Sequence, residues 1–162
     1  KIVAERGTDG QKAMADVLWA GAFESEEQLR EYYDVMGPLY ALKYDAEKAR
    51  ERRGRGILSP DAINEGFGGF LRTYDVTADL PKITAPTLVM AGSDDVMVNA
   101  ANAPILAERI PNAKLIMYPG LRHGFNAEKP DEVNADLLAF LKQHAATAGS
   151  TSGATTAAAA QA

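Results

Sequence analysis

Two polar loops follow the two most strand-like segments of the sequence. Residues 92–95 carry the adjacent carboxylates of Asp94 and Asp95, and residues 120–125 contain His123. A histidine can accept a hydroxyl proton near neutral pH and return it to a leaving group, while a carboxylate fixes the imidazole tautomer and stabilises the imidazolium. Asp95 and His123 could therefore be the acid and base of a Ser-His-Asp relay, with Asp94 as the acid if the turn is shifted by one residue.

This chemistry requires elements that bring the two loops together. Residues 86–91 form a short apolar run between a proline and a glycine, which is typical of a strand buried on both faces of a parallel sheet. Residues 114–118 predict a second strand, and a helix capped by Asn99 or Asn102 is predicted between them. Because parallel strands joined by a helix end at the same edge of a sheet, both loops should meet there.

The composition divides the chain into three zones. Residues 1–78 have apolar residues at helical spacing and predict helices only. Residues 79–144 predict a strand, a helix, a second strand and a last helix that opens at Pro130. Residues 145–162 contain only Ala, Thr, Gly, Ser and one Gln, so we expect a disordered tail that buries too little apolar surface to become ordered.

Capping residues locate two helices of the first zone. Ser25 predicts a helix start, with Gln28 at the reciprocal position of a capping box. A later helix is predicted to start at Ser59, with a proline at its first position, and to run to Leu71. Three glycines weaken that helix by about 1 kcal/mol each relative to alanine. We therefore expect packing or a close approach at Gly66, Gly68 and Gly69.

The overall composition excludes several classes of function. The 162 residues are 46% hydrophobic, enough for a globular core, and the net charge of −5 would not attract nucleic acid. The chain contains no cysteine, and its two histidines lie far apart, so we expect neither a metal site nor a cofactor. His144 is expected to be structural, at the end of the last helix. No apolar run approaches the ~18 residues of a membrane span, and we expect a cytoplasmic protein.

The residues around the two loops resemble a known family. Residues 85–95, A-P-T-L-V-M-A-G-S-D-D, are similar to the acid-bearing strand and G-x-x-D turn of α/β-hydrolases, and residues 119–124, P-G-L-R-H-G, are similar to their histidine loop. Residues 128–133 resemble the start of the family's last helix. The resemblance covers about residues 10–144 and implies that Asp95 is the triad acid and His123 the base.

The segment upstream looks like the end of the cap domain in proline iminopeptidase-like members, on the basis of residues 70–75 and 79–83. The resemblance thus implies a C-terminal fragment of an α/β-hydrolase fold, with a helical cap segment followed by a parallel β-α-β-α unit. It also implies a serine hydrolase that acts on small esters or amides, with N-terminal prolyl aminopeptidase action on short peptides as the leading interpretation. The cap residues that would bind substrate remain unassigned.

The family's nucleophile is missing from this sequence. It lies on a G-x-S-x-G elbow that precedes the acid in chain order, and no serine here has those flanking glycines; the serines are Ser25, Ser59, Ser93, Ser150 and Ser152. The chain also starts at Lys1 within a predicted helix. We therefore expect that a front half is missing and that this chain alone is inactive.

Two alternatives stay open at this point. The chain could be a noncatalytic binding module, because the strand over residues 87–91 would expose an edge that favours pairing with a partner. It could also belong to an α/β-hydrolase with other chemistry, such as an epoxide hydrolase or a dehalogenase.

Overall fold

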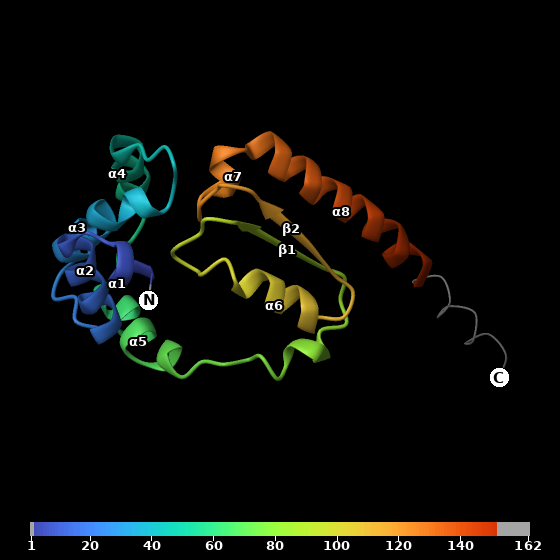
Figure 1. The fold of residues 1–162 in the computed structure, drawn as a ribbon, viewed down its shortest axis with the longest axis horizontal. Helices are drawn as coiled ribbons and strands as arrows, with labels where there is room; N and C mark the ends of the chain where they lie inside the picture. The colour runs from blue at the N-terminus through green and yellow to red at the C-terminus, as the bar shows by residue number, and fades with distance from the viewer. Residues whose placement is uncertain (1, 152–162) are drawn as a thin grey trace, which may run out of the picture.

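The computed structural model describes residues 2–151 as a helical part followed by an α/β part (Figure 1). The helical part contains α1 (Ile2–Arg6), α2 (Asp9–Ala20), α3 (Glu26–Met36), α4 (Ala46–Gly54) and α5 (Pro60–Gly68). The α/β part contains β1 (Thr87–Gly92), α6 (Asn102–Arg109), β2 (Ala113–Tyr118), α7 (Phe125–Glu128) and α8 (Pro130–Thr151). Single 3₁₀ turns lie at Gly37–Leu39, Phe70–Arg72 and Leu80–Lys82.

The predicted cap of α3 is present, but its partner differs from the prediction. The Ser25 hydroxyl accepts a hydrogen bond from the Gln28 amide at 3.2 Å. The Gln28 side chain accepts from the amide of Glu24 at 2.8 Å and not from that of Ser25, so the predicted reciprocal capping box is wrong. Gln28 thus satisfies a backbone donor one residue before the cap, which extends the hydrogen-bonded start of the helix.

Helix α5 starts at Pro60 behind the predicted Ser59 cap but ends at Gly68, earlier than Leu71. Glycine has a low helix propensity. The chain leaves the α-helix at the successive glycines Gly68 and Gly69 and then forms a 3₁₀ turn. The close approach predicted for these glycines is confirmed at Gly68, where an added Cβ would lie 2.8 Å from the Cα of Gly21 in the chain segment that ends α2. The absence of side chains at this crossing allows α2 and α5 to pack.

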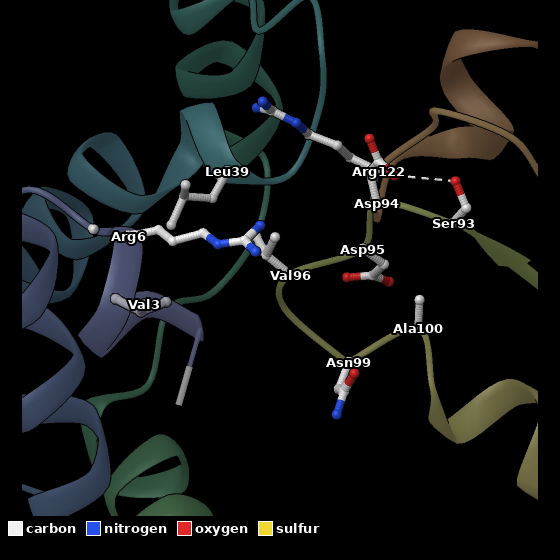
Figure 2. A pocket seen from close by; sticks show the side chains of 11 residues that line it. Val3, Arg6, Leu39, Ser93, Asp94, Asp95, Val96, Asn99, Ala100 and Arg122 are labelled. Atoms are coloured by element: carbon white, nitrogen blue, oxygen red, sulfur yellow. Dashed lines mark hydrogen bonds between the residues drawn. The ribbon is translucent and has the colours of Figure 1, made fainter.

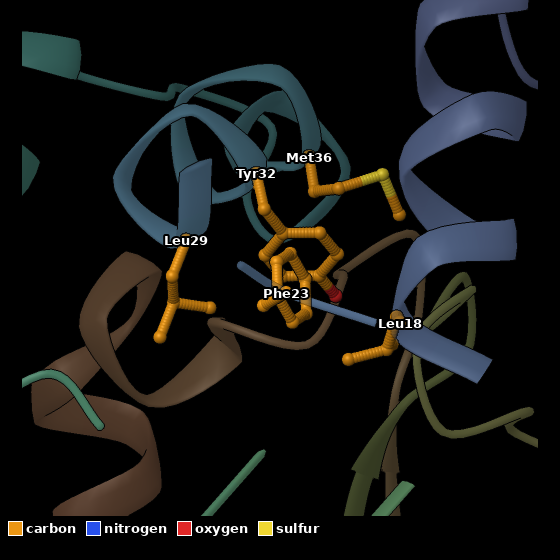
Figure 3. Close-up of a cluster of buried hydrophobic side chains, with 5 residues drawn as sticks. All are labelled: Leu18, Phe23, Leu29, Tyr32 and Met36. Carbon is orange, nitrogen blue, oxygen red and sulfur yellow. The ribbon is translucent and has the colours of Figure 1, made fainter. Parts of the chain in front are cut away.

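The core of the helical part lies between α2, α3 and the segment that joins them (Figure 3). Its buried side chains are Leu18, Phe23, Leu29, Tyr32 and Met36. The rings of Phe23 and Tyr32 meet edge to face with centroids 5.4 Å apart, an arrangement favoured by the aromatic quadrupole. This cluster anchors the chain segment that leads from α3 toward the α/β part.

The two strands are parallel, as predicted, and α6 connects them. Their register pairs Val89 with Leu115 and Gly92 with Tyr118. Figure 1 shows α6 and α8 on opposite sides of this strand pair. The predicted asparagine cap of α6 is wrong: Ala101 occupies the cap position without a side-chain bond, and the Asn99 side chain accepts from the Ala101 amide at 3.2 Å.

Helix α8 continues past the predicted start of the tail at Ala145 and ends at Thr151. Alanine has the highest helix propensity, and extending an existing helix avoids the cost of nucleation. Residues 152–162 of the expected tail lie outside the described residues. Because of this extension His144 lies within α8 and not at its end, with its ring 4.5 Å from that of Phe140.

Across residues 2–151, no helix has both the length and the apolar character needed to cross a bilayer.

Candidate active site

The loops that follow β1 and β2 touch each other along their backbones. The Ser93 amide donates to the Tyr118 carbonyl at 3.0 Å, and the Asp94 amide donates to the Leu121 carbonyl at 2.9 Å. Gly92 permits this approach, because a Cβ at that position would lie only 2.3 Å from the Leu121 carbonyl oxygen. The parallel register therefore brings the aspartate loop and the histidine loop together at one edge of the sheet, as the sequence predicts.

Asp95 is the carboxylate that reaches His123. Its side chain is buried, and one carboxylate oxygen, Oδ1, accepts the amides of Met97 at 2.8 Å and Val98 at 3.0 Å. The other oxygen, Oδ2, lies 2.9 Å from Nδ1 of His123. Asp94 is exposed and, among the described side chains, accepts only from the Ser93 hydroxyl, at 3.1 Å. The turn thus directs Asp95, and not the alternative Asp94, toward the imidazole.

His123 is held on one ring nitrogen and partly open to solvent. Its side chain is 40% exposed, against 9% for the side chain of Asp95. A carboxylate can only accept a hydrogen bond, so it favours the neutral tautomer with the proton on Nδ1. Nε2 is then the nitrogen with a free lone pair, and it can accept a proton from a hydroxyl or a water. The carboxylate of Asp95 thus orients the imidazole of His123 as a general base requires.

A segment of the helical part lies against the histidine loop. The Gly124 amide donates to the Tyr40 carbonyl at 2.7 Å, and an added Cβ on Gly124 would come within 3.2 Å of that oxygen. The ring of Tyr40 also meets the ring of His123 edge to face. The sequence does not predict this contact, because no local pattern relates Tyr40 to a residue as far along the chain as His123.

Two cavities border the aspartate. The larger has a volume of about 450 Å³ and lies between the β1 loop and the helical part, where Arg6 extends toward Val96 and Leu39 lines the helical side (Figure 2). The smaller, about 200 Å³, is bordered by both Asp95 and His123 and by apolar side chains of β1 and α6. A small substrate could therefore approach the pair through space that is already open.

The serines with described side chains have structural roles. Ser25 and Ser59 cap α3 and α5. The Ser93 hydroxyl accepts from the Gly120 amide at 2.8 Å and donates to Asp94. Each of these hydroxyls is committed to a neighbouring backbone or side chain, so none is presented to the imidazole as a nucleophile would be.

Within residues 2–151, no three potential metal ligands from His, Cys, Asp and Glu cluster closely enough to hold an ion. The contact between Asp95 and His123 is a hydrogen bond of 2.9 Å. Such a pair can transfer a proton at the imidazole, supported by the carboxylate.

The chain is similar to a protein-family model and to several known proteins. Residues 58–130 match the family model described as serine aminopeptidase, S33. The chain is 30% identical over 123 residues to the proline iminopeptidase PfmaB of Pestalotiopsis fici, covering 76% of this chain and 44% of that protein. It is 46% identical over 85 residues to a non-heme haloperoxidase of Rhodococcus erythropolis, covering 52% of this chain and 31% of the relative.

A third relative covers more of the chain. The bifunctional esterase/perhydrolase DCH of Acinetobacter calcoaceticus is 33% identical over 151 residues, which are 87% of this chain and 53% of the relative. The chain thus spans about half the length, or less, of the curated relatives it matches.

Solved structures show the same fold. An esterase from Exiguobacterium antarcticum superposes with a TM-score of 0.65 at 19% identity, over 82% of this chain and 48% of the esterase. MenH from S. aureus superposes with a TM-score of 0.58 at 26% identity, over 82% of this chain and 50% of MenH. The described residues therefore have the fold of an α/β-hydrolase, and the chain is related in sequence to hydrolases of that superfamily.

Proposed function

We propose that Asp95 and His123 are the acid and the base of a Ser-His-Asp triad, and that the chain is part of a serine hydrolase for small ester or amide substrates. The observation that carries this proposal is the 2.9 Å contact between Asp95 Oδ2 and His123 Nδ1. Two backbone amides hold the other oxygen of the carboxylate, so its orientation is set before substrate arrives. Such pre-orientation is what a triad acid supplies.

In this mechanism Nε2 of His123 accepts the proton of a serine hydroxyl while the serine oxygen bonds to the substrate's carbonyl carbon. The imidazolium then gives that proton to the departing alkoxide or amine as the bond to it breaks. A water then gives a proton to Nε2 while its oxygen bonds to the acyl carbon. The bond between that carbon and the serine oxygen breaks, the acid leaves, and the imidazolium returns its proton to the serine oxygen. Asp95 stays ionised throughout and stabilises the imidazolium.

The nucleophile, in this proposal, is a serine outside these 162 residues. Two observations support this. The described serines Ser25, Ser59 and Ser93 are engaged in caps and loop contacts. The curated relatives are about twice as long as the segment they share with this chain, or longer. The chain alone would then bind no acyl group covalently.

The proposed substrates are small acyl compounds. The relatives' names include a proline iminopeptidase, an esterase/perhydrolase and a putative carbamate hydrolase. The helical part would act as the cap over the site, since it borders the larger cavity through Arg6 and Leu39. Prolyl aminopeptidase action on short peptides is the leading specific activity, because it agrees with the matched family description as well as with one relative.

The test uses both the present chain and the complete polypeptide that the gene encodes. Hydrolysis of p-nitrophenyl acetate and of prolyl p-nitroanilide is measured, together with covalent labelling by a serine-reactive fluorophosphonate. We expect the complete polypeptide to be labelled and active, and the Asp95→Asn variant to lose roughly 10⁴-fold in kcat, as in a triad with a neutralised acid. The present chain alone should show neither labelling nor turnover.

Three outcomes would overturn the proposal. The first is a complete polypeptide without a G-x-S-x-G elbow, and the second is a His123→Gln variant of it with wild-type activity. The third is fluorophosphonate-sensitive turnover by the present chain, which would mean that one of its own serines is the nucleophile. The exposed Asp94→Asn variant is the matched control and should keep its activity.

A second candidate function is a noncatalytic binding module, and one observation favours it. In the described part of the chain β1 pairs with β2 along one edge only, so its other edge has free backbone donors and acceptors. Helix α8 also exposes Leu137, Leu138 and Leu141. Light scattering after size-exclusion chromatography separates the candidates, because a stable, monodisperse monomer would support an independent module, whereas aggregation would support part of a larger enzyme.

A further inference from the structure

Tyr40 lies at the junction of the helical part and the candidate base. It follows the 3₁₀ turn Gly37–Leu39, and its ring centroid is 5.4 Å from that of His123 at an interplanar angle of 79°. This edge-to-face geometry is the one that aromatic rings prefer. The ring of His123 is therefore limited on one side by Asp95 and on another by Tyr40.

Tyr40 is itself held at both ends. Its carbonyl accepts the Gly124 amide at 2.7 Å, next to His123 in the chain. Its side chain packs against the core of the helical part, to which Tyr32, a residue that is 3% exposed, belongs. Burial raises the pKa of Tyr40, so the side chain stays a neutral phenol at physiological pH. The ring thus has a fixed place between the core of the helical part and the imidazole.

The surrounding segment adds contacts on either side of His123. The Arg122 guanidinium donates to the carbonyls of Pro38 at 2.7 Å and Ala41 at 3.4 Å. The Leu42 amide donates to the Glu128 carboxylate. Residues 38–42, called here the Pro38–Leu42 bridge, therefore bind the histidine loop both before and after the base.

We infer that Tyr40 is a positioning residue for His123, which restricts rotation of the imidazole so that Nδ1 stays on Asp95 and Nε2 stays available for proton transfer. The inference rests on the proposed function for its catalytic meaning, but the restriction itself is a property of this chain. Rotation about the last side-chain torsion of histidine is broad and roughly two-fold. A 40% exposed imidazole with one hydrogen bond would readily turn without a second contact.

The loss of an edge-to-face aromatic pair should lower the ratio of paired to unpaired His123 about two- to tenfold. Exchange of the Nδ1 proton with water proceeds from the unpaired ring, so its rate should rise by the same factor. The exchange is measured by NMR on the present chain with ¹⁵N-labelled histidine. Tyr40→Leu should show this acceleration, whereas Tyr40→Phe, which keeps the ring, should remain within about twofold of wild type.

The matched control is Tyr74→Leu. Tyr74 also belongs to an edge-to-face pair, with Phe70 at 6.1 Å, but it is 61% exposed and its described ring partner is not a residue of the histidine loop. Its loss should leave the exchange rate of His123 unchanged. If circular dichroism shows that Tyr40→Leu does not fold, Tyr40→Met replaces the ring with an apolar chain that can adapt to the same space.

The inference is overturned if a folded Tyr40→Leu or Tyr40→Met variant exchanges at the wild-type rate, or if Tyr74→Leu accelerates exchange equally. Failure of the proposed function looks different. In that case the complete polypeptide is not labelled by the fluorophosphonate, while the response of His123 to Tyr40 remains. In an active complete polypeptide, Tyr40→Leu should lower kcat two- to tenfold with little change in KM, because Tyr40 does not line either of the two cavities that border Asp95.

Discussion

Gly92→Ala is the substitution that tests most directly how the site is assembled. Gly92 is buried at the end of β1, where the backbone of the histidine loop crosses it. An added Cβ would lie 2.3 Å from the Leu121 carbonyl oxygen and 2.5 Å from that of Arg122. Both obstructing atoms are backbone atoms, so no side-chain rotation can relieve the overlap. The histidine loop must move away from the strand.

The cost follows from these contacts. The oxygens must retreat by about 1 Å to reach an ordinary contact distance of roughly 3.5 Å, and overpacking of this kind costs up to about 3 kcal/mol. The 2.9 Å bond from the Asp94 amide to the Leu121 carbonyl is strained by the same movement, which adds about 1 kcal/mol. Alanine restricts the unfolded chain and offsets about 1 kcal/mol. The net destabilisation is therefore about 3 kcal/mol.

The measurement is the urea midpoint of unfolding at constant m-value, with the Nδ1 proton of His123 followed by NMR. Gly92→Ala should lower the midpoint and weaken the Asp95–His123 pair. The control is Gly66→Ala within α5, where the nearest neighbour of a Cβ outside the helix backbone is a Leu71 methyl at an ordinary 3.6 Å, and where alanine should stabilise by up to about 1 kcal/mol. A Gly92→Ala protein with wild-type stability and an intact pair would refute the proposed assembly of the two loops.

Three further predictions follow from other contacts. Asp95→Ala leaves the Met97 and Val98 amides without their acceptor and should lower the free energy of unfolding by about 2–3 kcal/mol. Asp95→Asn keeps an acceptor oxygen and should lower it less, and chemical denaturation of both variants measures the difference. Gly68→Ala should destabilise by about 1–3 kcal/mol in thermal unfolding, because its Cβ would meet the backbone of Gly21; equal stability would contradict the close crossing of α2 and α5. Burial raises the pKa of Tyr118 from 10.0 to about 12. The unfolded chain therefore loses the phenol proton at a lower pH than the folded chain does. The contribution of Tyr118 to the free energy of unfolding should be full below pH 10.0 and fall as the pH rises toward about 12. Melting temperatures over this alkaline range should fall less steeply for Tyr118→Phe, and parallel curves would show that this phenol contributes nothing.

The strands and the starts of α3, α5 and α8 were predictable because their signals are local. An apolar run between Pro86 and Gly92 indicates a buried strand wherever it occurs in the chain. Ser25 and Ser59 cap helices through bonds that span three residues. These interactions depend on neighbours in sequence, so the sequence contains all the information that decides them.

The wrong predictions concern choices between near-equal local alternatives. Gln28 could bond to the amide of either Ser25 or Glu24, and the geometry of the turn selected Glu24. Asn99 bends the chain before α6 with a φ of 22° and bonds within the turn, which leaves Ala101 at the cap position. In α8 an already formed helix extends across residues that would not start one alone. Small energy differences separate such states, and packing decides among them.

The sequence by itself determined that an aspartate and a histidine follow two parallel strands, because strand periodicity and loop position are written in consecutive residues. The family resemblance implied Asp95 as the partner of His123, with Asp94 as the alternative. The contact itself is decided by the tertiary structure, in which one backbone turn directs the two adjacent side chains in different directions and Asp95 faces the imidazole. The tertiary structure also decided that Tyr40 borders the imidazole. That contact joins segments far apart in the chain, and its partners are selected by the packing of whole elements, which no local pattern encodes.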